Sequence, residues 1–191
     1  MSEVEIGRET RETTVRVRLS LSGEPGRIDT GVGFLDHMLE LWAYHGRLGL
    51  TVEARGDLHV DAHHTVEDVG LVLGEALARI LGERKGLARY GEATIPMEEA
   101  LAQVVVDLAR RPYFRFEGRF PVEKVGTFDL ELIPEFLRAL TMKGLFTLHA
   151  RILYGENAHH MSEALFKALA YALRRALARE GEDVRSTKGV L

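Results

Sequence analysis

The stretch HGRLGLTVEARGDLHVDAHH, His45 to His64, returns as KGLFTLHARILYGENAHH, Lys143 to His160, with a gap of two residues. The second residue of each copy is a glycine, Gly46 or Gly144, that can end a helix. Each copy then alternates apolar and polar residues, as a half-buried strand does, and ends in a pair of histidines. A match of this length predicts that the chain arose by duplication of one structural unit.

The segments around these copies follow the same order in both halves. Apolar periodicity in the first half predicts strands at 13–21 and 48–55 and helices at 33–46 and 61–82. In the second half it predicts strands at 100–109, 113–120 and 145–154 and helices at 133–144 and 159–180. We therefore expect a repeated strand-strand-helix-strand-helix unit. The two repeats, about 8–88 and about 92–181, should pack as one domain over residues 1–191, with a C-terminal tail at 182–191.

The composition restricts the class of protein. The 191 residues include no cysteine, which removes disulfides, thiolate chemistry and cysteine-bound zinc and suits a reducing cytoplasm. No apolar run reaches the length of a membrane span, and the charged N-terminus lacks the apolar segment of a signal peptide. The net charge of -4 argues against general nucleic-acid binding. We expect a cytoplasmic protein with neither a membrane nor a nucleic-acid partner.

Each half carries the motif HHxxE at the start of a predicted helix, formed by His63, His64 and Glu67 and by His159, His160 and Glu163. Helix residues three or four apart share a face, so each glutamate neighbours both of its histidines. Adjacent histidines diverge by about 100°, so a pair can serve two ions or two sides of an interface. Imidazole and carboxylate without thiolate suit Mn, Fe, Co, Ni or Zn.

A single HHxxE motif is more often a solvated helix start than a metal site, but two copies at equivalent places favour a function. His37 lies 26 residues before His63, and Glu135 lies 24 residues before His159. The spacing predicts a ligand quartet in each half, the first with His37 and the second with Glu135. The other histidines, such as His45 near a helix end, are interpreted as structural.

A second group of residues suits an anion. It comprises Arg89 between the halves, Arg111 at a strand end, Lys167 one turn beyond Glu163, and the tail residues Ser186, Thr187 and Lys188. Hydroxyl, ammonium and guanidinium groups grip phosphate. Spacing alone also allows these residues to be solvated surface charges.

With these motifs in place, the chain resembles a known family, the imidazoleglycerol-phosphate dehydratases of histidine biosynthesis, in their monofunctional form. The resemblance runs from Arg8 to the C-terminal end. It is carried by GFLDHM, GDLHVDAHHTVEDVG, GERKG, RPY, GENAHHMSEALFKALAYALR and STKGVL.

The resemblance implies an α+β fold, with a four-stranded sheet and two helices in each half. It also implies a homo-oligomeric shell, typically of 24 chains, with active sites at subunit interfaces and two Mn²⁺ ions per active site. The implied ligands are His37, His63, His64, Glu67, Glu135, His159, His160 and Glu163. Glu135 stands where many members have a histidine, and Ala62 stands where an aspartate often precedes the histidine pair.

The implied activity is that of a lyase that removes water from D-erythro-imidazole glycerol phosphate to give imidazole acetol phosphate. Metal ions on the imidazole nitrogens would act as Lewis acids. Glu12 matches a substrate-contacting glutamate, and we assign it to proton transfer; without the resemblance it would be a solvated charge. The substrate contacts implied by the resemblance are Arg89, Arg111, Lys167, Ser186, Thr187 and Lys188.

Two other functions fit the histidine motifs. A metal-dependent hydrolase would use a metal-bound water. A metal-storage shell would need the ligands but no phosphate grip, so the anion-binding group argues against it.

Overall fold

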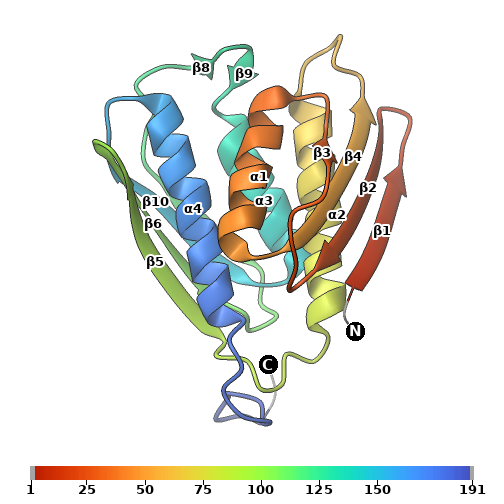
Figure 1. The fold of residues 1–191 in the computed structure, drawn as a ribbon, viewed down its shortest axis with the longest axis vertical. Helices are drawn as coiled ribbons and strands as arrows, with labels where there is room; N and C mark the ends of the chain where they lie inside the picture. The colour runs from red at the N-terminus through yellow and green to blue at the C-terminus, as the bar shows by residue number, and fades with distance from the viewer. Residues whose placement is uncertain (1–2, 190–191) are drawn as a thin grey trace.

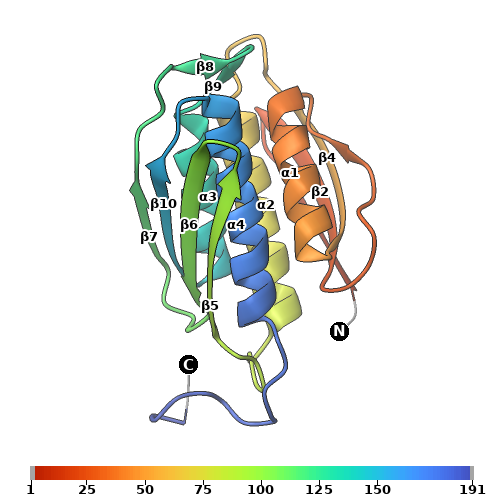
Figure 2. The ribbon, with the colours of Figure 1, turned by 60° about the vertical axis from the view of Figure 1, so that its left-hand side comes forward.

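The computed structural model describes residues 3–189, which form two four-stranded sheets, one short hairpin and four helices. The sheets are the two outer layers, and the helices fill the space between them (Figures 1 and 2). This arrangement confirms the α+β class and the duplicated half. The expected domain limits, residues 1 and 191, lie outside the described residues.

The first sheet has the order β1-β2-β4-β3, from β1 (Glu3–Glu9), β2 (Thr13–Ser20), β3 (Ile28–Asp29) and β4 (Gly49–Gly56). Val15, Val17 and Leu19 of β2 are fully buried, whereas Arg16 and Arg18 are exposed. This alternation places one face of the sheet against the helices and the other toward solvent.

The second sheet repeats this order as β5-β6-β10-β7, from β5 (Tyr90–Met97), β6 (Ala100–Asp107), β7 (Tyr113–Glu117) and β10 (Thr147–Tyr154). In both sheets the first three strands are antiparallel and the last is parallel to its neighbour. The expected five-element unit was incomplete, because the sheet in the described part of each half has four strands where three were expected. A short hairpin, β8 (Lys124–Val125) and β9 (Phe128–Asp129), precedes the third helix.

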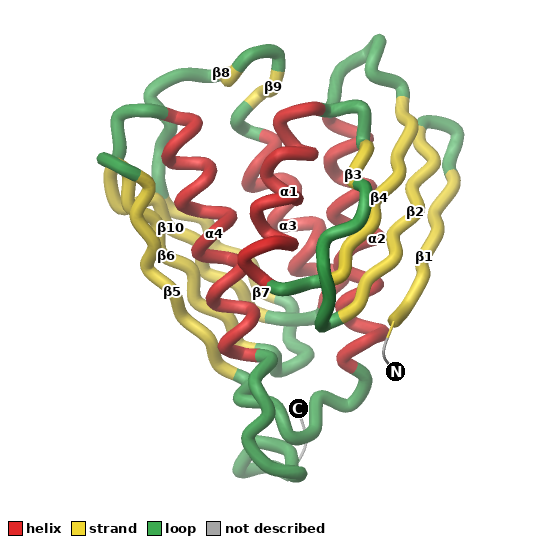
Figure 3. The backbone as a smooth tube through the Cα atoms, in the orientation of Figure 1, coloured by secondary structure: helices red, strands yellow, loops and turns green. Residues whose placement is uncertain are grey.

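The helices are α1 (Gly33–Gly46), α2 (His63–Leu81), α3 (Leu132–Gly144) and α4 (Ala158–Ala176). Helix α2 packs on β1 and β2, and α4 packs on β5 and β6. Between the sheets α1 lies against α4 and α2 lies against α3, so each helix pair joins the two halves. All four helices of residues 3–189 begin at the same end of the molecule, the upper end in Figures 1 and 3. No helix among them is both long and apolar enough to span a membrane.

The loop between the halves holds the C-terminal tail near the second sheet. Arg84 is 3% exposed and donates to the carbonyls of Gly144 (2.7 Å) and Leu145 (2.6 Å) at the end of α3. Burial lowers the pKa of this guanidinium to about 10. The backbone N–H of Glu180 donates to the carbonyl of Gly86. These contacts place the tail at the end of the molecule opposite to the helix N-termini (Figure 1).

Candidate active site

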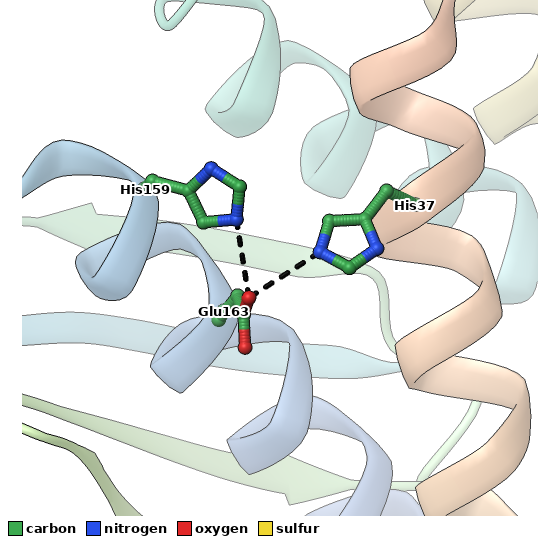
Figure 4. A group of neighbouring side chains, drawn as sticks. All are labelled: His37, His159 and Glu163. Carbon is green, nitrogen blue, oxygen red and sulfur yellow. Dashed lines mark hydrogen bonds and ion pairs between the residues drawn. The ribbon is translucent and has the colours of Figure 1, made fainter.

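The first cluster of metal-ligating groups joins α1 to α4. His37 Nε2 lies 3.3 Å and His159 Nε2 lies 3.1 Å from the same carboxylate oxygen of Glu163 (Figure 4). Asn157 caps α4 by accepting from the backbone N–H groups of His159 and His160, and so fixes where the motif begins. All three potential ligand atoms lie within 4.8 Å of one another.

Glu163 is held as a carboxylate. It is 9% exposed, and burial alone would raise its pKa. The ammonium of Lys167 at 2.6 Å and the hydrogen bonds with His37 and His159 outweigh burial and lower the pKa to about 2. The group is therefore negatively charged at neutral pH, as a metal ligand must be.

The second cluster joins α2 to α3. It consists of His63, Glu67 and Glu135, whose ligand atoms also lie within 4.8 Å of one another. The guanidinium of Arg138 pairs with both carboxylates, at 3.3 Å from Glu67. The hydrogen bond that it donates to Glu135 raises the pKa of the guanidinium. Glu135 thus occupies the place that the first cluster gives to His37.

The clusters correct the expected grouping of ligands. Spacing predicted one quartet within each half, but each cluster takes one helix from each half, because α1 packs on α4 and α2 packs on α3. The repeat still relates them: His37, His159 and Glu163 of one correspond to Glu135, His63 and Glu67 of the other.

The second histidine of each pair points away from both clusters. His64 Nδ1 lies 3.0 Å from Asp57 and 3.9 Å from Glu12, and His160 Nδ1 lies 2.7 Å from Glu99. The hydrogen bond with Asp57 raises the pKa of His64, and that with Glu99 raises the pKa of His160. Adjacent histidines therefore point into different surroundings, as the helical geometry predicts.

The donors fit divalent transition metals. Each cluster offers imidazole nitrogen and carboxylate oxygen, a set that suits Mn, Fe, Co, Ni or Zn. Both already hold cationic side chains against their carboxylates, Lys167 on Glu163 and Arg138 on Glu67. A metal ion would therefore compete with these two side chains for the carboxylates. Ala62 stands at the N-cap position of α2 and has no side chain that can cap the helix. The backbone N–H of His63 donates to the carboxylate of Asp61 at 2.8 Å.

The anion-binding group is partly brought together. A pocket of about 800 Å³ is lined by Arg89, Tyr90, Arg111, Arg185, Ser186, Thr187 and Lys188. Asp107 accepts two hydrogen bonds from Arg89, at 2.7 and 3.1 Å, and these raise the pKa of the guanidinium. Arg89 also donates to the carbonyl of Arg185, which ties the tail to this pocket. Lys167 does not line this pocket and instead contacts Glu163 of the first cluster.

The clusters and the pocket lie at opposite ends of α4. His159 stands in its first turn, and the pocket lies beyond its last residue, Ala176. This helix has 19 residues, so the separation is about 28 Å at 1.5 Å per residue. Glu12, in the turn between β1 and β2, belongs to the cluster end through its contact with His64.

Sequence reasoning missed three carboxylates that contact site residues: Asp57, Glu99 and Asp107. None belongs to HHxxE or lies on a helix, so helical spacing gave no signal for them. One signal was available, since Glu99 lies in the turn before the second strand of its half, as Glu12 does.

Comparison with known proteins identifies the family of this chain. The family model described as imidazoleglycerol-phosphate dehydratase matches residues 30–173. Imidazoleglycerol-phosphate dehydratases from Geobacillus thermodenitrificans and Clostridium botulinum are 51% and 52% identical to the chain, over 99% and 100% of its length and 98% of their own.

Solved structures agree. The Staphylococcus aureus imidazoleglycerol-phosphate dehydratase is 42% identical with a TM-score of 0.85, covering 93% of this chain and 99% of its own. The Pyrococcus furiosus IGPD, solved in complex with (S)-C348, is 40% identical with a TM-score of 0.85, covering 97% and 100%. The chain therefore belongs to the imidazoleglycerol-phosphate dehydratases, a family of hydro-lyase enzymes.

Proposed function

We propose that the chain dehydrates D-erythro-imidazole glycerol phosphate to imidazole acetol phosphate in L-histidine biosynthesis, with two Mn²⁺ ions per active site. The observation that carries the proposal is the pair of imidazole–carboxylate clusters, related by the repeat and built on helices that begin at the same end of the molecule (Figure 1). The ligands would be the cluster residues together with His64 and His160. When bound, the cations supply Lewis acidity to the imidazole ring of the substrate.

Glu12 is the acid–base group in this proposal. Its side chain is 56% exposed and faces His64 at 3.9 Å, so a substrate beside that histidine would meet its carboxylate. Dehydration needs a proton taken from carbon and a proton given to the departing hydroxyl. Glu12 carries out this proton transfer.

The pocket at the other end binds the phosphate. Arg89, Arg111 and Lys188 supply positive charge, and Ser186 and Thr187 supply hydroxyl donors. Lys167, beside Glu163, contacts the substrate at the cluster end instead of lining this pocket.

Two subunits must meet to complete a site. The substrate has a ring, a three-carbon chain and a phosphate, and spans about 10 Å at roughly 1.5 Å per bond. It cannot bridge the two ends of one chain. Sites at subunit interfaces follow, in a homo-oligomer that we propose to have 24 subunits. The subunit is one domain of two repeats, 8–88 and 92–181, with the tail 182–191, acting in the cytoplasm.

The test is turnover of imidazole glycerol phosphate by metal-stripped protein, with and without Mn²⁺, following formation of the ketone. Mn²⁺-dependent ketone formation supports the proposal. Release of inorganic phosphate without ketone would favour a hydrolase, and tight metal binding without either product would favour a storage shell. The mass of the assembled particle checks the subunit number.

A further inference from the structure

The repeat makes Glu99 the counterpart of Glu12. Strand β2 pairs Val17 with Val52 of β4, and β6 pairs Val104 with Ala150 of β10. Val52 and Ala150 are equivalent in the sequence repeat, so Val17 corresponds to Val104. Counting back along both strands brings Glu12 onto Glu99, each at the end of the turn that joins the first two strands of its half.

These equivalent glutamates have different surroundings. Glu99 accepts from His160 Nδ1 at 2.7 Å and from the backbone N–H groups of Glu156 and Asn157, at 3.1 and 2.7 Å. Glu12 lies 3.9 Å from the equivalent His64. One carboxylate is thus fixed by three hydrogen bonds, and the other lies beyond hydrogen-bonding distance of its histidine.

Asp57 accounts for the difference. Its carboxylate lies 3.0 Å from His64 Nδ1, in the place that Glu99 takes at His160. Asp57 directly follows β4, whereas Gly155 directly follows β10, so the second half has no carboxylate at this place. The backbone N–H of Asp57 donates to the carbonyl of Glu12 at 3.1 Å, which holds the two residues side by side.

A carboxylate at Nδ1 determines which nitrogen of the ring can bind a cation. The neutral imidazole then carries its proton on Nδ1 and leaves the Nε2 lone pair free. Such a partner also fixes the ring plane and raises ligand basicity. Both second histidines have this partner. Neither belongs to the first or the second cluster, but His160 forms a third group of potential ligands with Glu98 and Glu99.

We propose that Asp57 and Glu99 are positioning residues that present Nε2 of His64 and His160 to the cations, and that Asp57 thereby leaves Glu12 free to act on the substrate. The inference rests on the metal binding of the proposed function and assigns different roles to two equivalent glutamates, one to proton transfer and one to ligand orientation.

The first test measures Mn²⁺ affinity without substrate. The full-length protein is stripped, and free Mn²⁺ is followed by electron paramagnetic resonance during titration of wild type, Asp57→Ala, Glu99→Ala and the control Glu53→Ala. Glu53 is an exposed residue of β4. We expect each positioning variant to bind about 10- to 100-fold more weakly and the control to bind as wild type. Wild-type affinity in both positioning variants would overturn the inference.

A second variant guards against a folding defect, because Glu99 also accepts from two backbone amides. Glu99→Gln keeps one oxygen for the two amides, but its NH2 can then only donate to His160 Nδ1 and so favours the tautomer with the proton on Nε2. It should therefore keep the fold and still bind Mn²⁺ about as weakly as Glu99→Ala. Wild-type affinity in Glu99→Gln would show that orientation of His160 by an acceptor is not the role of Glu99.

The kinetic test separates the two carboxylates. At saturating Mn²⁺, Glu99→Ala should recover most of its kcat, because only cation binding was weakened. Asp57→Ala should stay slow, because Glu12 can then accept the hydrogen bond of His64 Nδ1 in place of Asp57. Full recovery in Asp57→Ala would refute the freeing of Glu12. Absence of ketone from the wild type would refute the proposed function and leave the affinity result intact.

Discussion

Arg89 links β6 to the C-terminal tail in the pocket that we propose for the phosphate. Two of its nitrogens pair with Asp107, a third donates to the carbonyl of Arg185, and its side chain is only 11% exposed. A planar guanidinium makes these contacts at once, whereas an ammonium cannot reproduce their geometry. Arg89 therefore orders the tail as well as adding charge.

Arg89→Lys should raise the KM for imidazole glycerol phosphate about tenfold, which corresponds to about 1.4 kcal/mol, with a smaller change in kcat. Trypsin should also cleave faster at Arg185. Steady-state kinetics and timed digestion check this. Arg151→Lys, at an exposed ion pair with Glu117, is the control. An unchanged KM and digestion rate would contradict the double role of Arg89.

His45 lies in the last turn of α1, with its ring 5.8 Å from that of Tyr171. Burial, and then the charge of Lys167, lower its pKa below 6.5. The unfolded chain therefore takes up this proton at a higher pH than the folded chain. Its contribution to the free energy of unfolding is present above about pH 6.5 and is lost as the pH falls toward the folded pKa.

The variant His45→Gln has no such proton to take up. Between about pH 7.5 and pH 5.5 it should lose less stability than the wild type, because one opposing protonation has been removed. Urea unfolding of the metal-free protein at both pH values measures the difference. An equal loss in both proteins would mean that burial does not set the charge of His45.

At the scale of the elements, two glycines set the distance between α2 and α3. A Cβ on Gly70 would lie 2.8 Å from the carbonyl oxygen of Phe136, and one on Gly74 would lie 2.5 Å from that of Leu140. These close approaches let His63 and Glu67 of α2 reach Glu135 of α3. The second cluster thus depends on packing about one to two turns further along α2.

Gly74→Ala should destabilise the fold by about 1–3 kcal/mol, as overpacking does, and should weaken Mn²⁺ binding at the second cluster. Thermal unfolding and metal titration measure these effects. Gly33→Ala is the matched control, since no atom lies within 4 Å of its added Cβ. Equal stability of the two variants would disprove the close-packing argument.

The elements differ in how well the sequence predicted them. The helices and β2, β4, β6, β7 and β10 were confirmed, because apolar periodicity follows their buried faces. Strands β1 and β5 were missed. β1 buries only Val4 and Ile6, and as an edge strand it depends on hydrogen bonds to β2. β3 has two residues, too few for any pattern.

At the scale of the whole molecule, the long separation between clusters and pocket gives a direct test. Glu163→Gln should disable the cluster end, and Lys188→Ala should disable the pocket. Each homo-oligomer should be nearly inactive. When the two variants are co-expressed with different tags and purified as a mixed oligomer, sites with both ends intact should form and activity should return. A mixed oligomer as inactive as its parents would place the whole site within one chain.

The candidate site was predicted in its residue types but not in its assembly. The repeat identified His37, Glu135 and the two HHxxE motifs, and it predicted that adjacent histidines diverge. The repeat could not show that α1 packs on α4 and α2 packs on α3, because helix pairing depends on three-dimensional packing and not on order along the chain. Nor could it place Asp107 or Asp57, whose roles depend on neighbours brought in by the fold.

Clusters that each need a helix from both halves have an evolutionary consequence. An ancestral half of roughly 90 residues is a domain of ordinary size. It would have supplied only one of the two helices that carry the ligands of each cluster. It could have held a cation in this way only by associating with a second copy, and both sites would have been identical. After gene duplication and fusion, one chain carried both helices of each cluster. The ligands of the two halves could then mutate independently. The carboxylate of Glu135 opposite the imidazole of His37 is the trace of that freedom.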